Sequence, residues 1–168
     1  MRRTEPLQDP SLPARILEWY DRWGRRLPWR ETRDAYAILV SEIMLQQTQV
    51  SRVLPYFHRW MERFPSWRQL AEAPVADVIL SWSGLGYNRR ALVLQSIARE
   101  VEKAGVPQHE DEWLALKGIG PYTAAALTLF ALRKRAVPID TNIRRIGGRV
   151  LLGNPFSEPA HDRNLREE

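Results

Sequence analysis

Apolar residues recur at helical spacing along most of this chain, and that periodicity constrains the fold more than any other feature of the sequence. Ile16, Trp19, Tyr20 and Trp23 follow the i, i+3, i+4, i+7 pattern of one helix face, and Gly24 ends the pattern. Further helices are predicted from an N-cap at Asp34 through Leu45, over 50–64, 67–71 and 75–82, around 94–101, up to Leu116, and over 122–132 and 141–152. No segment shows the two-residue alternation of a strand, so the sequence predicts an all-α fold.

The composition favours a polyanionic partner without requiring one. The 168 residues carry a formal net charge of +5, and only Lys103, Lys117 and Lys134 among the 25 basic residues are lysines. Arginine grips phosphate groups through a planar fork, so an arginine-rich basic chain suits nucleic acid. A basic protein whose arginines are simply solvated is an equal alternative.

The sequence contains no cysteine. This excludes disulfide, thiolate and cysteine-bound iron–sulfur chemistry within these residues, and no other metal site is predicted. The N-terminal MRRTEPLQDP lacks the apolar core of a secretory signal, and no apolar run approaches the length of a membrane span. We therefore expect no membrane association and a cytoplasmic location, at the nucleoid if the source is a bacterium.

The segment LKGIGPYTA predicts two helices joined by a tight hairpin. Gly118 and Gly120 permit positive φ and leave room for a close partner, and Pro121 presets the first turn of the second helix. The N–H groups of such a turn point outward together as an anion site, and a DNA phosphate is the natural anion. An ordinary αα-hairpin in a helical bundle would use the same residues.

Four further segments accompany the hairpin: LPWR at 27–30, SEIMLQQTQV at 41–50, GLGYNRRA at 84–91 and PIDTNIRRI at 138–146. In this order they resemble the helix-hairpin-helix superfamily of base-excision DNA glycosylases, and within it the adenine DNA glycosylases, the MutY-like enzymes. The resemblance runs from about Trp19 to Leu152. LPWR and MLQQTQV are specific to the adenine branch, whereas the hairpin and the following Asp140 are shared by the wider superfamily.

The resemblance implies a two-lobed fold that acts as one catalytic unit over 1–168. A six-helix barrel would cover 30–137 and include the hairpin at 112–133, while 1–29 with 138–168 would form an incomplete second lobe. The last helix start, at Ser157 and Pro159, comes near the end of the sequence, which we interpret as truncation of a longer chain or a frayed tail. The family's [4Fe–4S] cluster, held by four cysteines, is expected only beyond residue 168, and its absence leaves the activity of this chain open.

Glu42 and Asp140 are the candidate catalytic carboxyl groups. Cutting an adenine–deoxyribose bond needs a proton donor for the base and an anion for the cation-like sugar, as in glycoside hydrolysis. Glu42 lies on or beside the buried stripe of its helix, and partial burial favours the protonated acid that would donate to the base. The resemblance places the family's general acid at Glu42 and its sugar-stabilising Asp at Asp140. A boundary Glu paired with an arginine, and an Asp that only caps a helix, are the alternatives.

Tyr122 and Asn142 complete the predicted chemistry. Superfamily members that also nick the backbone carry a lysine at the position of Tyr122, whose amine forms a Schiff base with the sugar. The resemblance therefore implies a monofunctional glycosylase, and it implies that Asn142 helps to orient Asp140. Tyr122 used only for helix packing is the alternative.

The remaining candidate residues would contact DNA. Extruding a paired base leaves a gap, which the family fills with residues matching Gln47 and Tyr87, although a polar helix end would also explain Gln47. Leu27, Trp29 and Arg30 resemble residues around the family's adenine pocket, and Trp29 would serve equally in core packing. The other candidates are Gly118, Gly120 and Thr123 of the hairpin and the arginines Arg89, Arg90, Arg144 and Arg145, which are phosphate contacts or solvated surface.

Three functions stay open at this stage. The first is excision of adenine opposite 8-oxoguanine or guanine in double-stranded DNA, by a monomer. The second is excision of thymine or uracil opposite guanine, against which MLQQTQV argues. The third is a truncated, non-catalytic DNA-binding module. A helical scaffold that ignores DNA would require every motif to be a coincidence.

Overall fold

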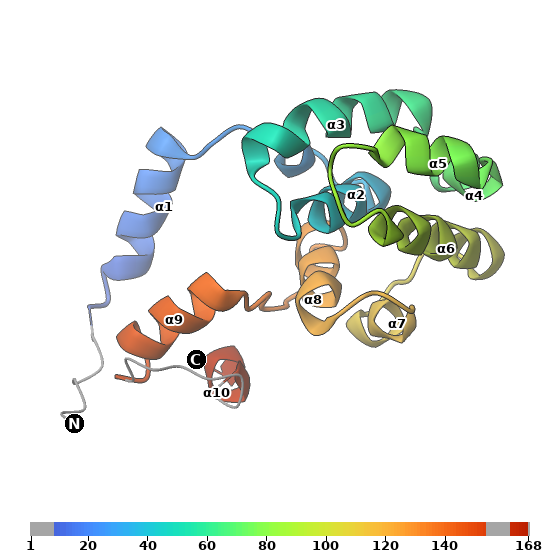
Figure 1. Cartoon of the computed structure of the whole chain (residues 1–168). Helices are drawn as coiled ribbons and strands as arrows, with labels where there is room; N and C mark the ends of the chain where they lie inside the picture. The colour runs from blue at the N-terminus through green and yellow to red at the C-terminus, as the bar shows by residue number, and fades with distance from the viewer. Residues whose placement is uncertain (1–8, 154–161, 168) are drawn as a thin grey trace. The chain divides into compact units, whose positions relative to one another are not determined.

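The computed structural model describes residues 9–153 and 162–167, and every regular element in that part of the chain is a helix (Figure 1). The elements are α1 (Leu12–Trp23), the short 3-10 helix η1 (Pro28–Arg30), α2 (Ala35–Leu45), α3 (Val50–Arg63), α4 (Trp67–Glu72), α5 (Val75–Trp82), α6 (Arg89–Ala104), α7 (Glu110–Ala115), α8 (Pro121–Phe130), α9 (Thr141–Val150) and α10 (Asp162–Glu167). The prediction of an all-α fold is therefore confirmed. None of the described helices combines the length and apolarity needed to cross a membrane.

The chain forms two compact units. The larger unit covers 27–136 and holds η1 and α2 to α8, and the smaller unit covers 1–26 with 137–168 and holds α1, α9 and α10. The family resemblance predicts domain boundaries at residues 30 and 137, close to those of the two units. That the two units act together as one catalytic unit stays a prediction.

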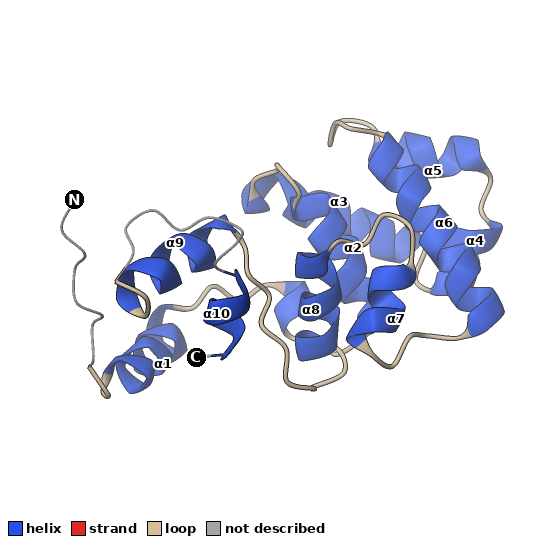
Figure 2. Cartoon of the chain, turned by 90° about the horizontal axis from the view of Figure 1, so that it is seen from below, coloured by secondary structure: helices blue, strands red, loops and turns tan. Residues whose placement is uncertain are grey.

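Helix α2 is the centre of the larger unit. It is buried on nearly all sides, with eight of its 11 residues buried, and α3, α6, α8 and η1 pack around it (Figures 1 and 2). A helix that is apolar all round must be covered on every face, which is why its neighbours surround it. The predicted N-cap is confirmed, because the Asp34 carboxylate accepts a hydrogen bond of 3.0 Å from the Tyr36 N–H.

Buried aromatic rings join α2 to α3 and α5. The Tyr36 hydroxyl donates to the Phe64 carbonyl at 2.6 Å and accepts from the Trp60 indole N–H at 3.1 Å. Trp60 also meets Trp82 edge to face at 5.3 Å. Burial raises the pKa of Tyr36 above its ordinary value, so the hydroxyl stays protonated as a donor. The side chain of Trp60 is almost fully buried.

Helix α1 ends before Gly24 as predicted, but its apolar face is not buried. None of its residues is buried in the described structure, and Trp19 and Trp23 are 60% and 71% exposed. Periodicity identifies the apolar face of a helix and does not show whether another element covers it. The apolar stripe of α1 is therefore not part of the core in the described structure, although its spacing is that of a buried helix face.

Pro55 does not delay the start of its helix, because α3 begins at Val50 with Pro55 inside it. The predicted helix start at Ser157 and Pro159 lies outside the described residues, but α10 is not a frayed tail. Its Leu165 is buried against Gly147 of α9.

The Gly-x-Gly hairpin between α7 and α8 depends on a close approach to α6. Gly118 has φ +102°, in the left-handed region, and a Cβ at this position would overlap the Val93 side chain. Gly118 is therefore used both for its backbone conformation and for its missing side chain.

We expect Gly118→Ala to lower the free energy of unfolding by about 2 kcal/mol or more, because it adds a clash with Val93 to an unfavourable φ. Gly105→Ala is the matched control. Gly105 also has a positive φ, +88°, but nothing lies within 4 Å of its Cβ position, so we expect a loss of about 1 kcal/mol. Urea unfolding of both variants measures the difference, and equal losses would show that the contact with Val93 contributes nothing.

Candidate active site

The loop after α2 presents Gln47 in an unusual backbone conformation. Gln47 has φ +56° and is exposed, and the neighbouring Gln46 and Gln49 are also exposed. A residue other than glycine in the left-handed region is uncommon, and such residues concentrate at functional sites. The lone acid of α2, Glu42, is half-buried between the buried Ser41 and Ile43, one turn before the helix ends.

The turn from α5 to α6 presents Tyr87 in the same way. Gly84 and Gly86 have φ +96° and +78°, and Tyr87 follows them at φ +51° with 69% of its surface exposed. A tyrosine at positive φ is an outlier, so the surrounding contacts must hold it there. The phenol ring is thus displayed to solvent at a fixed point of the turn.

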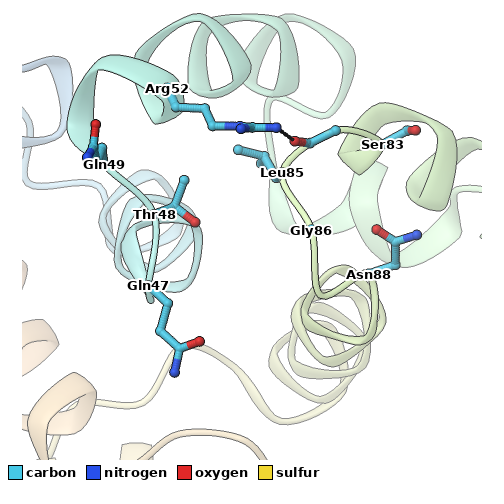
Figure 3. Close-up of a pocket in the computed structure, with 9 residues that line it drawn as sticks. Gln47, Thr48, Gln49, Arg52, Ser83, Leu85, Gly86 and Asn88 are labelled. Carbon is cyan, nitrogen blue, oxygen red and sulfur yellow. Dashed lines mark hydrogen bonds between the residues drawn. The ribbon is translucent and has the colours of Figure 1, made fainter.

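A polar groove of about 690 Å³ lies between these two loops (Figure 3). It is lined by Gln47, Thr48, Gln49, Arg52, Ser83, Gly84, Leu85, Gly86 and Asn88. The lining offers amides, hydroxyls and one guanidinium, but no carboxylate. Arg52 crosses the groove and donates to the Gly84 carbonyl. Such a lining suits hydrogen bonding to base edges or phosphate and does not repel an anionic polymer.

Asp140 has a fixed direction in the smaller unit. It is the N-cap of α9, and its carboxylate accepts a hydrogen bond of 2.7 Å from the Ile143 N–H. Asn142 accepts from the Arg145 guanidinium at 3.2 Å, rather than contacting Asp140. Its predicted role in orienting Asp140 therefore stays a prediction without a contact behind it.

The hairpin residues at the start of α8 differ in their exposure to solvent. Gly120 is the N-cap, Pro121 follows it, and Tyr122 is 37% exposed. Thr123 is buried at 6% exposure, so its side chain does not face DNA as predicted. Its N–H still belongs to the first turn of the helix, where donors point outward. Ala124 already bonds to the Gly120 carbonyl.

The residues of the LPWR segment separate into two kinds. Leu27 and Trp29 are buried at 6% and 7% exposure, and Trp29 meets the Phe57 ring edge to face at 5.1 Å. Both belong to the core cluster of the larger unit, which supports the packing alternative for Trp29. Arg30 is exposed and stays a candidate for contact with a base or phosphate.

The four candidate phosphate arginines also differ. Arg89 is exposed, and so is Arg145 despite its bond to Asn142. Arg144 instead forms a two-point ion pair with Asp162 of α10, at 2.6 and 2.7 Å, which raises the pKa of Arg144. Arg90 turns inward and donates to backbone carbonyls. The prediction of a phosphate contact is therefore wrong for Arg90 and Arg144, since both guanidinium groups are already engaged.

Comparison with known proteins identifies the class. The helical fold with its hairpin is that of a helix-hairpin-helix protein, and the chain belongs to the HhH-GPD superfamily of base excision DNA repair proteins, whose family model matches residues 40–167. The predicted family resemblance is confirmed. Glu42, the groove and Asp140 all fall within the matched region.

Curated relatives of this chain are named adenine DNA glycosylase. The one from Mycolicibacterium smegmatis is 44% identical over 158 residues, covering 91% of this chain and 53% of the relative. The one from Homo sapiens is 41% identical over 147 residues, covering 80% of this chain and 27% of the relative. The chain thus spans about half the length of the bacterial relative and less of the human one.

Solved structures share the fold. A thermostable thymine-DNA glycosylase superposes with a TM-score of 0.83 at 26% identity, over 93% of this chain and 76% of that one. An endonuclease III in a non-covalent DNA complex superposes with a TM-score of 0.75 at 17% identity, over 92% and 74% of the two chains. At that identity the second likeness concerns the fold alone.

The chain does not fit the family's iron–sulfur cluster. Thiolates are the usual ligands of such a cluster, and the sequence has no cysteine. Among the described residues no group of three or more His, Asp or Glu side chains is placed to hold a metal ion.

We expect Asp140→Ala to speed exchange of the Ile143 amide by about fivefold or more, because it removes a cap that typically contributes about 1 kcal/mol. Asp140→Asn keeps an acceptor oxygen and should leave the exchange within about twofold. NMR-detected amide exchange measures both variants. Equal protection in Asp140→Ala would contradict the capping role seen in the structure.

Proposed function

We propose that this chain carries the catalytic residues of an adenine DNA glycosylase. It would hydrolyse the N-glycosidic bond of adenine mispaired with 8-oxoguanine or guanine in double-stranded DNA, acting as a monomer. The observation that carries the proposal is that one largely buried helix holds the candidate acid and leads directly into the loop that lines the groove. Helix α2 holds the half-buried Glu42, and five residues later its end presents the exposed Gln47 at the groove. Relatives that bear the name adenine DNA glycosylase match across this region.

The proposed reaction assigns one role to each carboxyl group. Glu42 gives its proton to the adenine base, and the C1′–N9 bond breaks with its electron pair leaving on the base. The Asp140 carboxylate stabilises the oxocarbenium-like sugar that results. Water then adds to C1′, and its proton returns to the Glu42 carboxylate, which balances the hydrolysis. The convergence of the two carboxyl groups on one nucleotide is part of this proposal.

Duplex recognition is assigned to the groove and the hairpin. Gln47 and Tyr87 stand exposed on the two loops and would occupy the space left by the extruded base. The first turn of α8 would hold a phosphate without regard to sequence. Arg30 and Arg89, both exposed, supply further positive charge.

Excision of thymine or uracil is the second candidate function. The thymine-DNA glycosylase that shares the fold at a TM-score of 0.83 favours it. A panel of duplexes with adenine, thymine or uracil opposite guanine, and adenine opposite 8-oxoguanine, separates the two functions by the base released. Release of thymine or uracil without adenine would replace the first proposal by the second.

We expect Glu42→Gln to lower the single-turnover rate of adenine release from an adenine:8-oxoguanine duplex by about 10²-fold or more, the range that general acid catalysis supplies. Glu62→Gln, on the exposed surface of α3, is the matched control and should retain the full rate. An unchanged rate in Glu42→Gln would refute the assignment of the acid. A wild-type chain that binds duplex but releases no base would be a non-catalytic binding module.

We expect the wild-type chain to resist covalent trapping on DNA by borohydride, because Tyr122 has no amine to form a Schiff base. Tyr122→Lys should become trapped, since it places a primary amine at the start of α8. Tyr122→Phe is the control and should not be trapped. Gel-shift under denaturing conditions reads the covalent product, and trapping of the wild type at the level of Tyr122→Lys would contradict a monofunctional mechanism.

A further inference from the structure

Arg90 contacts both loops of the candidate site with a single guanidinium group. It is the second residue of α6 and is half-buried. Its Nη1 donates to the carbonyls of Ile43 and Met44 at 3.0 and 3.4 Å and to that of Gln46. Its Nη2 donates to the carbonyls of Leu85 and Gly86 at 3.4 and 3.1 Å. One planar group therefore joins two loops that lie about forty residues apart in the sequence.

At the end of α2 the guanidinium replaces a conventional helix cap. The last carbonyls of a helix have no partner within the helix, and they carry the negative end of its dipole. Helices often end with a glycine in the left-handed conformation, but Gln47 takes that conformation here at φ +56°. The positive Nη1 donor satisfies carbonyls at this end and opposes the dipole.

Two of the Arg90 hydrogen bonds are made to the peptide groups directly before Gln47 and Tyr87, the two residues with positive φ. Nη1 bonds to the carbonyl of Gln46, directly before Gln47, and Nη2 bonds to the carbonyl of Gly86, directly before Tyr87. Each of these contacts fixes the peptide plane that leads into a left-handed residue. Strained backbone persists only where its surroundings over-determine it, and Arg90 is the contact that both positions share.

Aromatic rings complete the surroundings of the guanidinium. Its Cζ lies 5.5 Å from the centroid of Trp82 and 5.3 Å from that of Tyr87. The Trp82 indole N–H also donates to the Gly86 carbonyl at 3.0 Å. Burial lowers the pKa of Arg90, although a guanidinium remains charged at neutral pH. Tyr87 is thus held in two ways: hydrogen bonds fix the Gly86 carbonyl before it, and the guanidinium lies over its ring.

We propose that Arg90 is the positioning residue that holds Gln47 and Tyr87 at a fixed separation. A DNA duplex would then contact both loops as one rigid surface. The coupling of the loops is a property of the free protein. Its consequence for DNA rests on the proposed function, because there the two residues must enter the duplex together. Arg90 would act through these residues and would not touch the reacting atoms.

The planar fork of arginine is essential to this role. Two nitrogens a fixed distance apart reach the two loops simultaneously, whereas the ammonium of a lysine is a single point at the end of a flexible stem. Arg90→Lys therefore keeps the charge and removes the bridge. Arg99→Ala is the matched control, since Arg99 lies on the same helix and also donates to a backbone carbonyl, that of Ala71 at 3.0 Å.

Amide hydrogen exchange of the DNA-free protein tests the coupling directly. In Arg90→Lys we expect exchange over both 45–49 and 84–88 to accelerate by about tenfold or more, the factor typical of one lost charge-assisted hydrogen bond. Exchange in the buried part of α6, 94–101, should not change, which separates loop release from global destabilisation. Arg99→Ala should leave both loops protected. Faster exchange in only one loop, or in neither, would overturn the proposal.

Binding tests the consequence for DNA. The probes are a duplex with 2′-fluoro-2′-deoxyadenosine opposite 8-oxoguanine, which resists hydrolysis, and a fully paired duplex of the same sequence. We expect Arg90→Lys to reduce the affinity ratio of the two duplexes by about tenfold, while affinity for the paired duplex stays within about twofold. An unchanged ratio together with released loops would overturn the positioning role. If the wild type does not distinguish the duplexes, the proposed function fails, and the exchange measurement still decides the coupling.

Discussion

The burial of most of α2 is the constraint on which the larger unit depends. A helix without a polar face cannot border solvent along its length, so α3, α6 and α8 must surround it. This arrangement leaves Glu42, the one carboxylate of the helix, in a half-buried position. It also puts the end of α2 beside the start of α6, where Arg90 reaches its carbonyls. The acid and the groove therefore follow from the same packing requirement.

Much of the fold could be predicted because its signals are local. The Asp34 cap, the break at 83–88 and the Gly-x-Gly turn each depend on the chemistry of a few adjacent residues. The helices bounded by them appear close to their predicted positions. Burial depends on which elements meet, and here prediction was less successful. Trp60 lies in the core, whereas Trp19 and Trp23, which have the helical spacing of a buried face, are exposed.

The candidate site was predicted by residue type better than by orientation. Gln47 and Tyr87 are exposed on loops, as a role in DNA binding requires. Leu27, Trp29 and Thr123 are buried. Their burial could not be predicted from the motifs, because a motif does not show which side of the backbone faces the core. Arg90 looked like one of several surface arginines, and its carbonyl partners come from loops that only the tertiary structure brings together. Thr48 lies within the motif MLQQTQV but was not itself a candidate, and Ser83 had no distinguishing signal in the sequence.

The two carboxyl groups of the proposed reaction are held by different local means. Glu42 lies in the last turn of the largely buried helix α2, whereas Asp140 is held at the N-cap of α9 by the Ile143 N–H. The two groups therefore stand in different local surroundings, one in an apolar helix and the other at a helix N-terminus. In the proposed mechanism the two units together bring both groups to the same nucleotide.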